Sequence, residues 1–394
     1  MPSSTSNSEA EELEARRTAP GLRLTAADRP GVAQPVPERD IPDRPWRAVS
    51  LAVLVMTLAL TGLWEWRMRT LQLTPGDLGD GPSSWAEQRR RIDTEVVPVA
   101  IVGDSRILFD TSFDRFEALT GLRPVQLALP GTNGRPFLED LAADPKFKGL
   151  VIVGLADTSY FRPGVGLMAD ALDHGRWESP ATRGSFLIHQ VLARRIALLD
   201  TDYRLSTLVA RLDPNLRAGV DGPYGDVWKI RQTAEGRQSW LWPRLQRDAR
   251  LLAHARAVWT DHNPGFTGAP VPPAIIAMTL ARTTAAVAKI RAHGGDVVFV
   301  RPPSAPQLRV REDRSLPRSA GWNALLAAAH AQGVHFDDLP AAQGLDIPEY
   351  SHLSRACSVV FTDAYVRRLA ALTPRIAIKT NAPPPLSAKD CVGG

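Results

Sequence analysis

The sequence predicts an α/β protein in which a parallel sheet lies between two layers of helices. Apolar, β-branched runs at 96–102, 150–153 and 296–301 alternate with helical patterns at 113–120, 135–143 and 274–293. Such alternation is typical of parallel sheets that carry helices on both faces. The 394 residues, with 44% hydrophobic and 23% charged side chains, suffice for a substantial core. We therefore expect a three-layer α/β/α domain.

The N-terminal part of the chain predicts a membrane anchor. Residues 1–45 are rich in Ser, Glu, Pro and Arg without an apolar period, which is typical of a disordered tail. Residues 48–64 then carry no charge, and as a helix they would span about 26 Å. Trp46 and Trp66 flank this stretch, as tryptophans do at membrane interfaces. We expect a transmembrane helix over 46–67; the alternative is a buried core helix.

Charge asymmetry predicts the orientation of this anchor. Four arginines lie in the twenty residues before the apolar stretch, whereas two lie in the twenty after it. The positive-inside rule then predicts a cytoplasmic tail and an extracytoplasmic, periplasmic domain of a single-pass inner-membrane protein. Cys357 and Cys391 both fall in the exported part, where they could form a disulfide that closes the C-terminal tail.

The exported part is expected to contain four segments. A juxtamembrane connector occupies 68–95, with a short helix over 85–91, and the α/β domain occupies 96–372. Within it, residues 165–262 lose the alternation and predict a helical insertion. The Pro-rich tail 373–394 is expected to be extended or disordered. The insertion holds five tryptophans that suit either its core or a carbohydrate face: Trp177, Trp228, Trp240, Trp242 and Trp259.

The most informative turn follows the first strand, where the apolar run ends in Gly103-Asp104-Ser105. This arrangement can present Ser105 at the carboxyl end of a buried strand, where ligands of open α/β sheets bind. A nucleophilic serine would suit that position. The alternative is an ordinary turn in which Asp104 or Ser105 caps the next helix.

Near the C-terminus, Glu349 stands three residues before His352, ahead of a helical stretch over 362–372. A histidine and a carboxylate can supply a general base and the group that orients it. Asp346 is an alternative carboxylate, three residues farther back.

Together, the Gly-Asp-Ser turn and this Glu-x-x-His pair resemble the SGNH (GDSL-like) hydrolase superfamily, whose blocks are G-D-S and D-x-x-H. The resemblance covers most of residues 96–372 and implies a flavodoxin-like fold. It implies Ser105 as nucleophile, His352 as general base and Glu349, in place of the usual Asp, as the acid.

The middle blocks match this family less well. Gly131, after the second strand at 124–129, fits the glycine whose N–H joins the oxyanion hole. The third block, G-x-N-D, corresponds to Gly154-Leu155-Ala156-Asp157, which puts Ala156 in place of the Asn donor. Losing one such donor typically lowers turnover by about 10²–10³-fold. We expect Asn133 to compensate from the neighbouring loop.

The two neighbours of the serine have alternative roles. Asp104 could cap a helix and Arg106 could form a surface ion pair, or both could contact substrate, with Arg106 binding an anionic group.

These observations predict an extracytoplasmic ester hydrolase or O-acyltransferase that acts on acetyl groups of a cell-surface polysaccharide, with a membrane-bound acyl-donor protein as a further partner. The alternative is a catalytically impaired binding or scaffold protein that keeps the fold. No cofactor or metal site is expected, because the histidines lack ligand-like partners at useful spacing. The net charge is only +5 and the arginines are scattered, which argues against nucleic-acid binding. The sequence does not separate hydrolysis from transfer.

Overall fold

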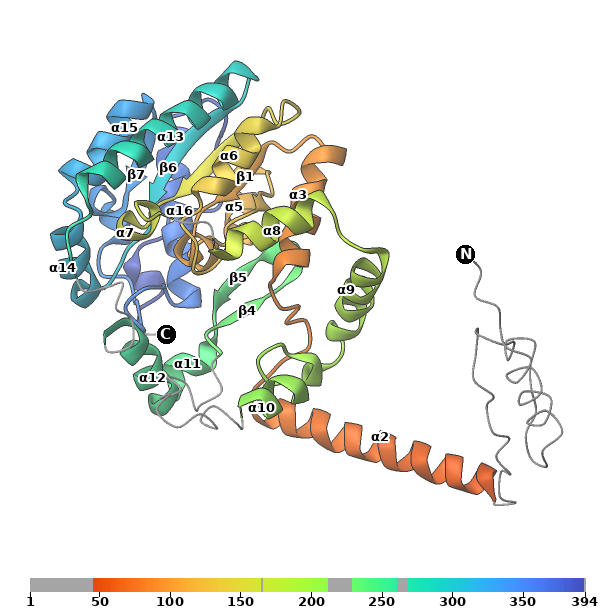
Figure 1. Cartoon of the computed structure of the whole chain (residues 1–394). Helices are drawn as coiled ribbons and strands as arrows, with labels where there is room; N and C mark the ends of the chain where they lie inside the picture. The colour runs from red at the N-terminus through yellow and green to blue at the C-terminus, as the bar shows by residue number, and fades with distance from the viewer. Residues whose placement is uncertain (1–44, 164–165, 212–228, 261–267, 393–394) are drawn as a thin grey trace, which may run out of the picture. The chain divides into compact units, whose positions relative to one another are not determined.

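The computed structural model describes residues 45–163, 166–211, 229–260 and 268–392. The chain divides into two units, 1–63 and 64–394, which are described separately. The second unit is built on five parallel strands in the order β2-β1-β3-β6-β7 (Figure 1). Their bounds are Val99–Val102 for β1, Val125–Gln126 for β2, Leu150–Gly154 for β3, Asp296–Arg301 for β6 and Gln332–His335 for β7.

This strand order confirms the predicted parallel α/β sheet. In chain order it reads 2-1-3-4-5, the order of flavodoxin-like doubly wound sheets. The chain passes from one side of β1 to the other between β2 and β3. In such sheets, ligands bind outside the carboxyl ends of the strands, next to that switch point. Several strand bounds differ from expectation: β1 and β2 are shorter than 96–102 and 124–129, β3 is one residue longer than 150–153, and β7 begins two residues before the predicted 334–337.

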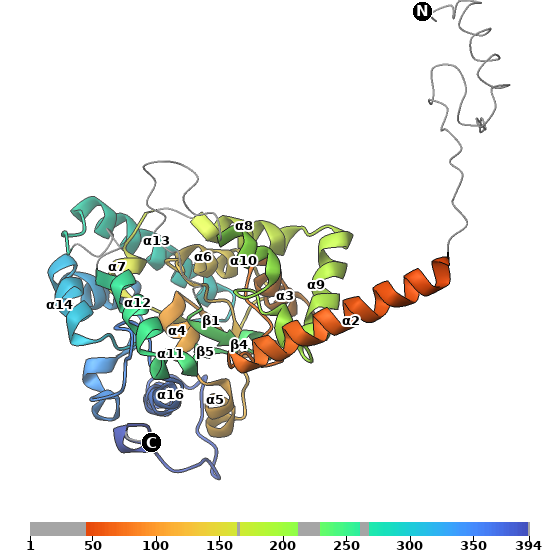
Figure 2. The ribbon, with the colours of Figure 1, turned by 90° about the horizontal axis from the view of Figure 1, so that it is seen from below.

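Successive residues of a strand pack alternately into two hydrophobic cores, one on each face of the sheet. In β1, Ala100 and Val102 pack into one core, whereas Val99 and Ile101 pack into the other. All four are fully buried, because a strand with helices on both faces has no solvent side. Helices α3, α6, α8, α13 and α15 supply the first core, and α4, α5 and α16 supply the second. Figure 2 shows the two helical layers on either side of the strands.

The helices follow the predicted alternation closely, since α5 and α6 match their expected bounds and α13 is shifted by one residue. The helices of the α/β part are α3 (Pro82–Thr94), α4 (Ser105–Phe109), α5 (Phe113–Thr120), α6 (Arg135–Ala143), α7 (Asp157–Tyr160), α13 (Pro273–Ala292), α14 (Pro306–Ser315), η4 (Ser319–Asn323), α15 (Ala324–Ala329), η5 (Phe336–Asp338), η6 (Pro340–Ala342), α16 (Arg355–Ala370) and η7 (Ala388–Asp390).

The insertion is mostly helical, as predicted, but it also contains a β-hairpin. Its elements are α8 (Gly166–Arg176), α9 (Pro180–Ala193), η1 (Ala197–Leu199), α10 (Leu205–Arg211), β4 (Arg231–Thr233), η2 (Glu235–Arg237), β5 (Ser239–Leu241), α11 (Pro243–Arg247) and α12 (Ala249–Thr260). Strands β4 and β5 pair antiparallel. Sequence patterns miss the hairpin because three-residue strands are too short to show an alternating period.

The tryptophans of the insertion have different surroundings. Trp242 is buried in a small core with Met68 and Tyr203, whereas 73% of Trp177 is exposed. Trp240 donates its Nε1–H to Gln232. Trp228 lies outside the described residues.

Helix α2 (Trp46–Thr70) covers the predicted anchor and extends three residues beyond it. Among the described residues, α2 and α13 are the helices that are long and apolar enough to cross a membrane. The two differ in burial: none of the apolar window of α2 is buried, whereas α13 packs Val287 and Ile290 into the core of the sheet.

The C-terminal tail is extended, but it is held against the domain rather than disordered. The Lys379 N–H donates to the Leu119 carbonyl of α5, and the Leu386 N–H donates to Asp363 of α16. Cys391 forms a disulfide with Cys357 of α16, which is the pairing that the sequence suggested. Backbone contacts between segments far apart in sequence supply this order, and a Pro-rich composition carries no signal for them.

Candidate active site

Ser105 lies at the carboxyl end of β1, where a glycine turn leads into α4. Gly103 has a φ of 148°, and a Cβ atom there would lie 2.6 Å from the Gly154 carbonyl oxygen, so the turn excludes other residues. Asp104 caps α4 by accepting the Arg106 N–H at 3.0 Å. The expected helix cap is therefore confirmed, and the same turn presents Ser105 at the carboxyl end of β1, while its role as a nucleophile stays a prediction.

His352 meets Ser105 across the carboxyl edge of the sheet, although 247 residues separate them. The His352 Nε2 atom lies 2.8 Å from Ser105 Oγ, within the 3.5 Å that a nucleophile and base pair would require. His352 belongs to the loop before α16, which is held in place because the Leu353 N–H donates to the buried Asp110 at 2.9 Å. Phe109 packs against the imidazole with ring centroids 4.5 Å apart.

Glu349 continues this hydrogen-bonded chain. Its Oε1 atom lies 2.8 Å from His352 Nδ1 and accepts the His352 backbone N–H at 2.5 Å. Its Oε2 atom accepts the indole N–H of Trp259 from α12. Burial raises the pKa of Glu349, but the charge of His352 and the hydrogen bonds from His352 and Trp259 outweigh it, so the pKa is lowered overall. The carboxylate therefore stays ionised at neutral pH.

Asp346, the alternative acid, lies outside this chain. Its side chain is exposed and accepts a hydrogen bond from Gln246 at 3.0 Å. Glu349, by contrast, is 1% exposed. Of the two carboxylates, only Glu349 is hydrogen-bonded to His352.

A small pocket of about 130 Å³ opens beside Ser105. Gly131 borders it with a φ of 72°, the left-handed conformation that glycine adopts most readily. Ala156 also borders it, where the family resemblance expects an Asn. The other residues that line the pocket are Asp104, Arg106, Thr132, Thr158, Ser159, Arg162, Trp259 and Ser351.

Asn133 does not belong to the described lining of the pocket, which corrects the expectation that it replaces the missing donor. Its Oδ1 atom accepts the Arg135 N–H at the start of α6, and its Nδ2 atom donates to the Arg162 carbonyl at 3.3 Å. Asparagine readily makes such local bonds at helix starts, and this preference is not visible in a spacing argument.

Arg106 borders the pocket, and two of its three guanidinium nitrogens, Nε and Nη2, contact buried partners. It is 2% exposed, pairs with Glu312 of α14 and donates to Ser351 Oγ at 3.2 Å. Arg301 contacts the same carboxylate at 2.6 Å. Burial raises the pKa of Glu312, yet Arg106 and Arg301 lower it to about 2. This network corrects the expectation of a surface ion pair, whereas substrate binding stays a prediction, because Arg106 borders the pocket and its Nη1 has no hydrogen-bond partner among the described residues.

Asp104 is also mostly buried, and its carboxylate serves the capping bond. Burial raises its pKa, and the charges of Arg106 and His352 oppose that rise. Asp104 therefore holds the serine turn, and its expected contact with substrate stays a prediction, since the residue also borders the pocket.

Sequence reasoning missed three contributors to this site. Trp259 was noted only as an aromatic residue, although its indole N–H holds the acid. Thr158 and Arg162 line the pocket from α7 and the loop after it. No motif marks these residues: Trp259 is placed by the fold of the insertion, and Thr158 and Arg162 follow the third block without belonging to it.

No protein-family model matches the chain, and no curated protein is significantly similar to it. Among the residues that the structure describes, no group of His, Cys, Asp or Glu could hold a metal ion.

Proposed function

We propose that this protein is a serine-dependent acyl ester hydrolase or O-acyltransferase of the SGNH type. The observation that carries the proposal is the hydrogen-bonded chain from Ser105 through His352 to Glu349, which opens on a pocket at the carboxyl edge of the sheet. Acyl transfer through a covalent intermediate requires a nucleophile, a base that accepts its proton and a carboxylate that orients the base, hydrogen-bonded in that order.

In the proposed mechanism, Ser105 Oγ attacks the acyl carbonyl carbon while His352 Nε2 takes the hydroxyl proton. Glu349 fixes the tautomer of the ring through Nδ1 and stabilises the imidazolium that forms. His352 then returns the proton to the alcohol that leaves, which gives an acyl-Ser105 ester. Water or a sugar hydroxyl, deprotonated by His352, completes hydrolysis or transfer.

Three groups are proposed to hold the oxyanion. The Ser105 N–H, at the first turn of α4, and the Gly131 N–H have no hydrogen-bond partner among the described residues. The Thr158 hydroxyl borders the same pocket and likewise has no partner there. We assign Thr158 the role of the Asn that Ala156 replaces, since a hydroxyl can donate to an oxyanion as an amide can.

The size and charge of the pocket point to a small acyl group on a polar carrier. About 130 Å³ accommodates an acetyl group more readily than a long acyl chain, and the basic side chain of Arg162 forms part of the lining. The apolar α2 and the Cys357–Cys391 disulfide support an anchored domain in an oxidising, extracytoplasmic compartment. We therefore propose acetyl groups of a cell-surface polysaccharide as the substrate class, with a membrane-bound protein as the acyl donor in the transfer reaction.

Reaction of the full chain with a fluorophosphonate probe tests the proposed chemistry. We expect covalent labelling at Ser105 that is lost in Ser105→Ala and strongly slowed in His352→Ala. Labelling that persists in Ser105→Ala, or a folded wild-type protein that does not label, would refute it. In the latter case the second candidate, a glycan-binding protein that kept the fold, would be favoured, as the alanine at 156 suggests.

Reporter fusions test the proposed location in the inner membrane. Alkaline phosphatase fused after Gly394 should be active, and a cytoplasmic reporter at the same position should be inactive. The reverse result would contradict an extracytoplasmic domain.

A further inference from the structure

One edge of the 64–394 unit exposes a concentration of large apolar side chains. Of the ten large apolar residues that are exposed beyond α2 in the described part of the chain, seven lie between residues 177 and 209. Scattered exposed apolar residues are normal, but a group within one short segment indicates a contact surface. We call this group the apolar edge: Trp177, Leu187, Ile188, Val191, Leu192, Leu205 and Val209.

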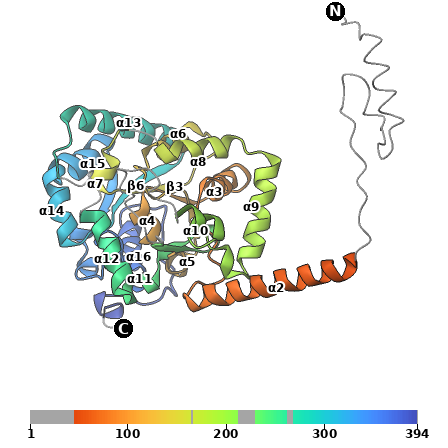
Figure 3. The ribbon, with the colours of Figure 1, turned by 60° about the horizontal axis from the view of Figure 1, so that its bottom comes forward.

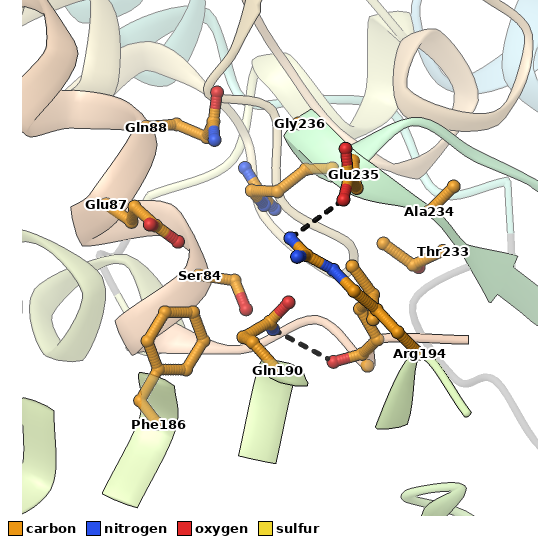
Figure 4. Close-up of a pocket in the computed structure, with 13 residues that line it drawn as sticks. Ser84, Glu87, Gln88, Phe186, Gln190, Arg194, Thr233, Ala234, Glu235 and Gly236 are labelled. Carbon is orange, nitrogen blue, oxygen red and sulfur yellow. Dashed lines mark hydrogen bonds and ion pairs between the residues drawn. The ribbon is translucent and has the colours of Figure 1, made fainter. Parts of the chain in front are cut away.

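Helix α9 carries four of these residues. An ordinary surface helix turns its apolar side toward the core, whereas α9 turns an apolar side toward the outside. Phe186 and Gln190 face inward and border a polar pocket of about 190 Å³ with Ser84 and Glu87 of α3 (Figure 4). The opposite side carries the four apolar residues, and Gly184 beside them has nothing within 4 Å of a Cβ position. A helix that shows its apolar side outward lacks a partner in this chain's described residues.

The C-terminal end of helix α2 contacts the segment between α9 and α10. Glu65 of α2 accepts the backbone N–H groups of Ala197 and Leu198, at 3.1 and 2.8 Å, directly after α9. The Gly76 N–H donates to the Ala193 carbonyl at the last residue of α9. Met68 also packs against Ala197 and Tyr203. The residues that follow the proposed membrane span are thus hydrogen-bonded to the C-terminal end of α9 and to the residues just after it.

The composition of the edge matches a lipid interface. Trp177 is 73% exposed and lies just before the N-terminus of α9, at the end far from the contacts with α2. Tryptophan favours the headgroup region of a membrane. Exposed Arg183, Arg195 and Arg204 accompany the apolar residues and can bind lipid phosphates. A helix with an apolar stripe bordered by arginines is typical of one lying in the membrane interface.

We propose that α9 and α10 lie on the outer leaflet of the membrane that α2 spans, with the apolar edge inserted among the lipid headgroups. The proposal rests on the proposed membrane anchor and adds a second attachment. One helix alone leaves a domain free to tilt and rotate, whereas a helix and an edge together hold the pocket in one orientation to the membrane surface.

A fluorescent reporter at single positions tests this surface in the full chain. The native cysteines are joined in a disulfide, so an introduced cysteine is the one available for an environment-sensitive label. Val191→Cys reports the apolar edge, and Val310→Cys on α14 is the matched control, since the two valines are 53% and 60% exposed. Figure 3 shows α9 and α14 on opposite sides of this unit. Leu58→Cys in α2 reports the anchor.

The three variants are reconstituted into nanodiscs of zwitterionic and anionic lipids that carry spin labels both near the headgroup and deep in the acyl chain. We expect about twofold or greater quenching at residues 58 and 191 and almost none at 310. Quenching at 58 without quenching at 191 would overturn the proposed surface and leave the anchor intact, whereas no quenching at either position would overturn the anchor itself. A label at 191 that is shielded from aqueous iodide yet not quenched by lipid would instead show a protein partner or a second copy.

Discussion

Replacing Trp259 with Phe tests whether the insertion positions Glu349, the proposed acid of the site. The variant keeps an aromatic ring, which in the wild type lies edge-on to His352 at 6.0 Å, and removes only the indole N–H. That N–H is the partner of Glu349 Oε2 among the described residues. Trp259→Phe therefore leaves one oxygen of a buried carboxylate without a hydrogen bond.

The expected loss follows from the strength of that bond. Hydrogen bonds to charged groups contribute about 1.5–3 kcal/mol, which corresponds to a fall of about 10- to 100-fold in turnover. The kcat for an activated aryl acetate should fall while KM stays near its original value, because Trp259 holds the orienting acid rather than the acyl group. The pKa of Glu349 also rises without this donor. As the pH is lowered, the variant should therefore lose activity at a higher pH than the wild type does.

Trp240→Phe is the matched control, since Trp240 lies in the same insertion and its N–H bonds Gln232 instead. Ser105→Ala supplies the blank rate, and thermal unfolding shows whether each variant keeps its fold. Wild-type kcat in Trp259→Phe, or an equal loss in Trp240→Phe, would refute the assignment of Trp259 as the residue that positions Glu349.

Three further predictions concern the Thr158 hydroxyl, the buried Glu312 carboxylate and the Cys357–Cys391 disulfide. Thr158→Val should lower kcat by about 10²-fold on an acetylated sugar, with Thr158→Ser near wild type; equal activity of both variants in steady-state assays would exclude the hydroxyl as an oxyanion donor. The folded-state pKa of Glu312 is depressed from 4.5 to about 2, so it contributes about 3 kcal/mol of stability above pH 4.5 that is lost as pH falls toward 2. Urea unfolding should show this loss in the wild type and not in Glu312→Gln, and parallel curves would contradict it. Cys391→Ser should lower the free energy of unfolding by about 2–4 kcal/mol, because the disulfide closes a loop of 34 residues; unchanged denaturant midpoints would show that the tail is held by its other contacts.

The sequence alone predicts the sheet well, because its signals are local. The runs that became β1, β3 and β6 are apolar and β-branched, and the helices between them have clear periods or caps, such as Ser112 at the start of α5. The Gly-Asp-Ser turn is local as well: Gly103 adopts the backbone that its neighbours require, and Asp104 caps the helix that follows. Ser105, His352 and Glu349, the proposed nucleophile, base and acid, could therefore be singled out from two short motifs and the family that those motifs resemble.

Only the tertiary structure decides which groups surround those side chains. Asn133 and Arg106 suited contacts with an oxyanion or a substrate by their positions in the sequence, yet each is engaged by neighbours that the sequence does not place: the Arg162 carbonyl and Glu312. Trp259 contacts Glu349 across 90 residues of chain. Residue type and order determine where strands, turns and helices form, because those interactions act within a few residues. Long-range packing determines which polar atoms remain available to a substrate, because a buried donor or acceptor takes whatever partner the folded chain brings to it.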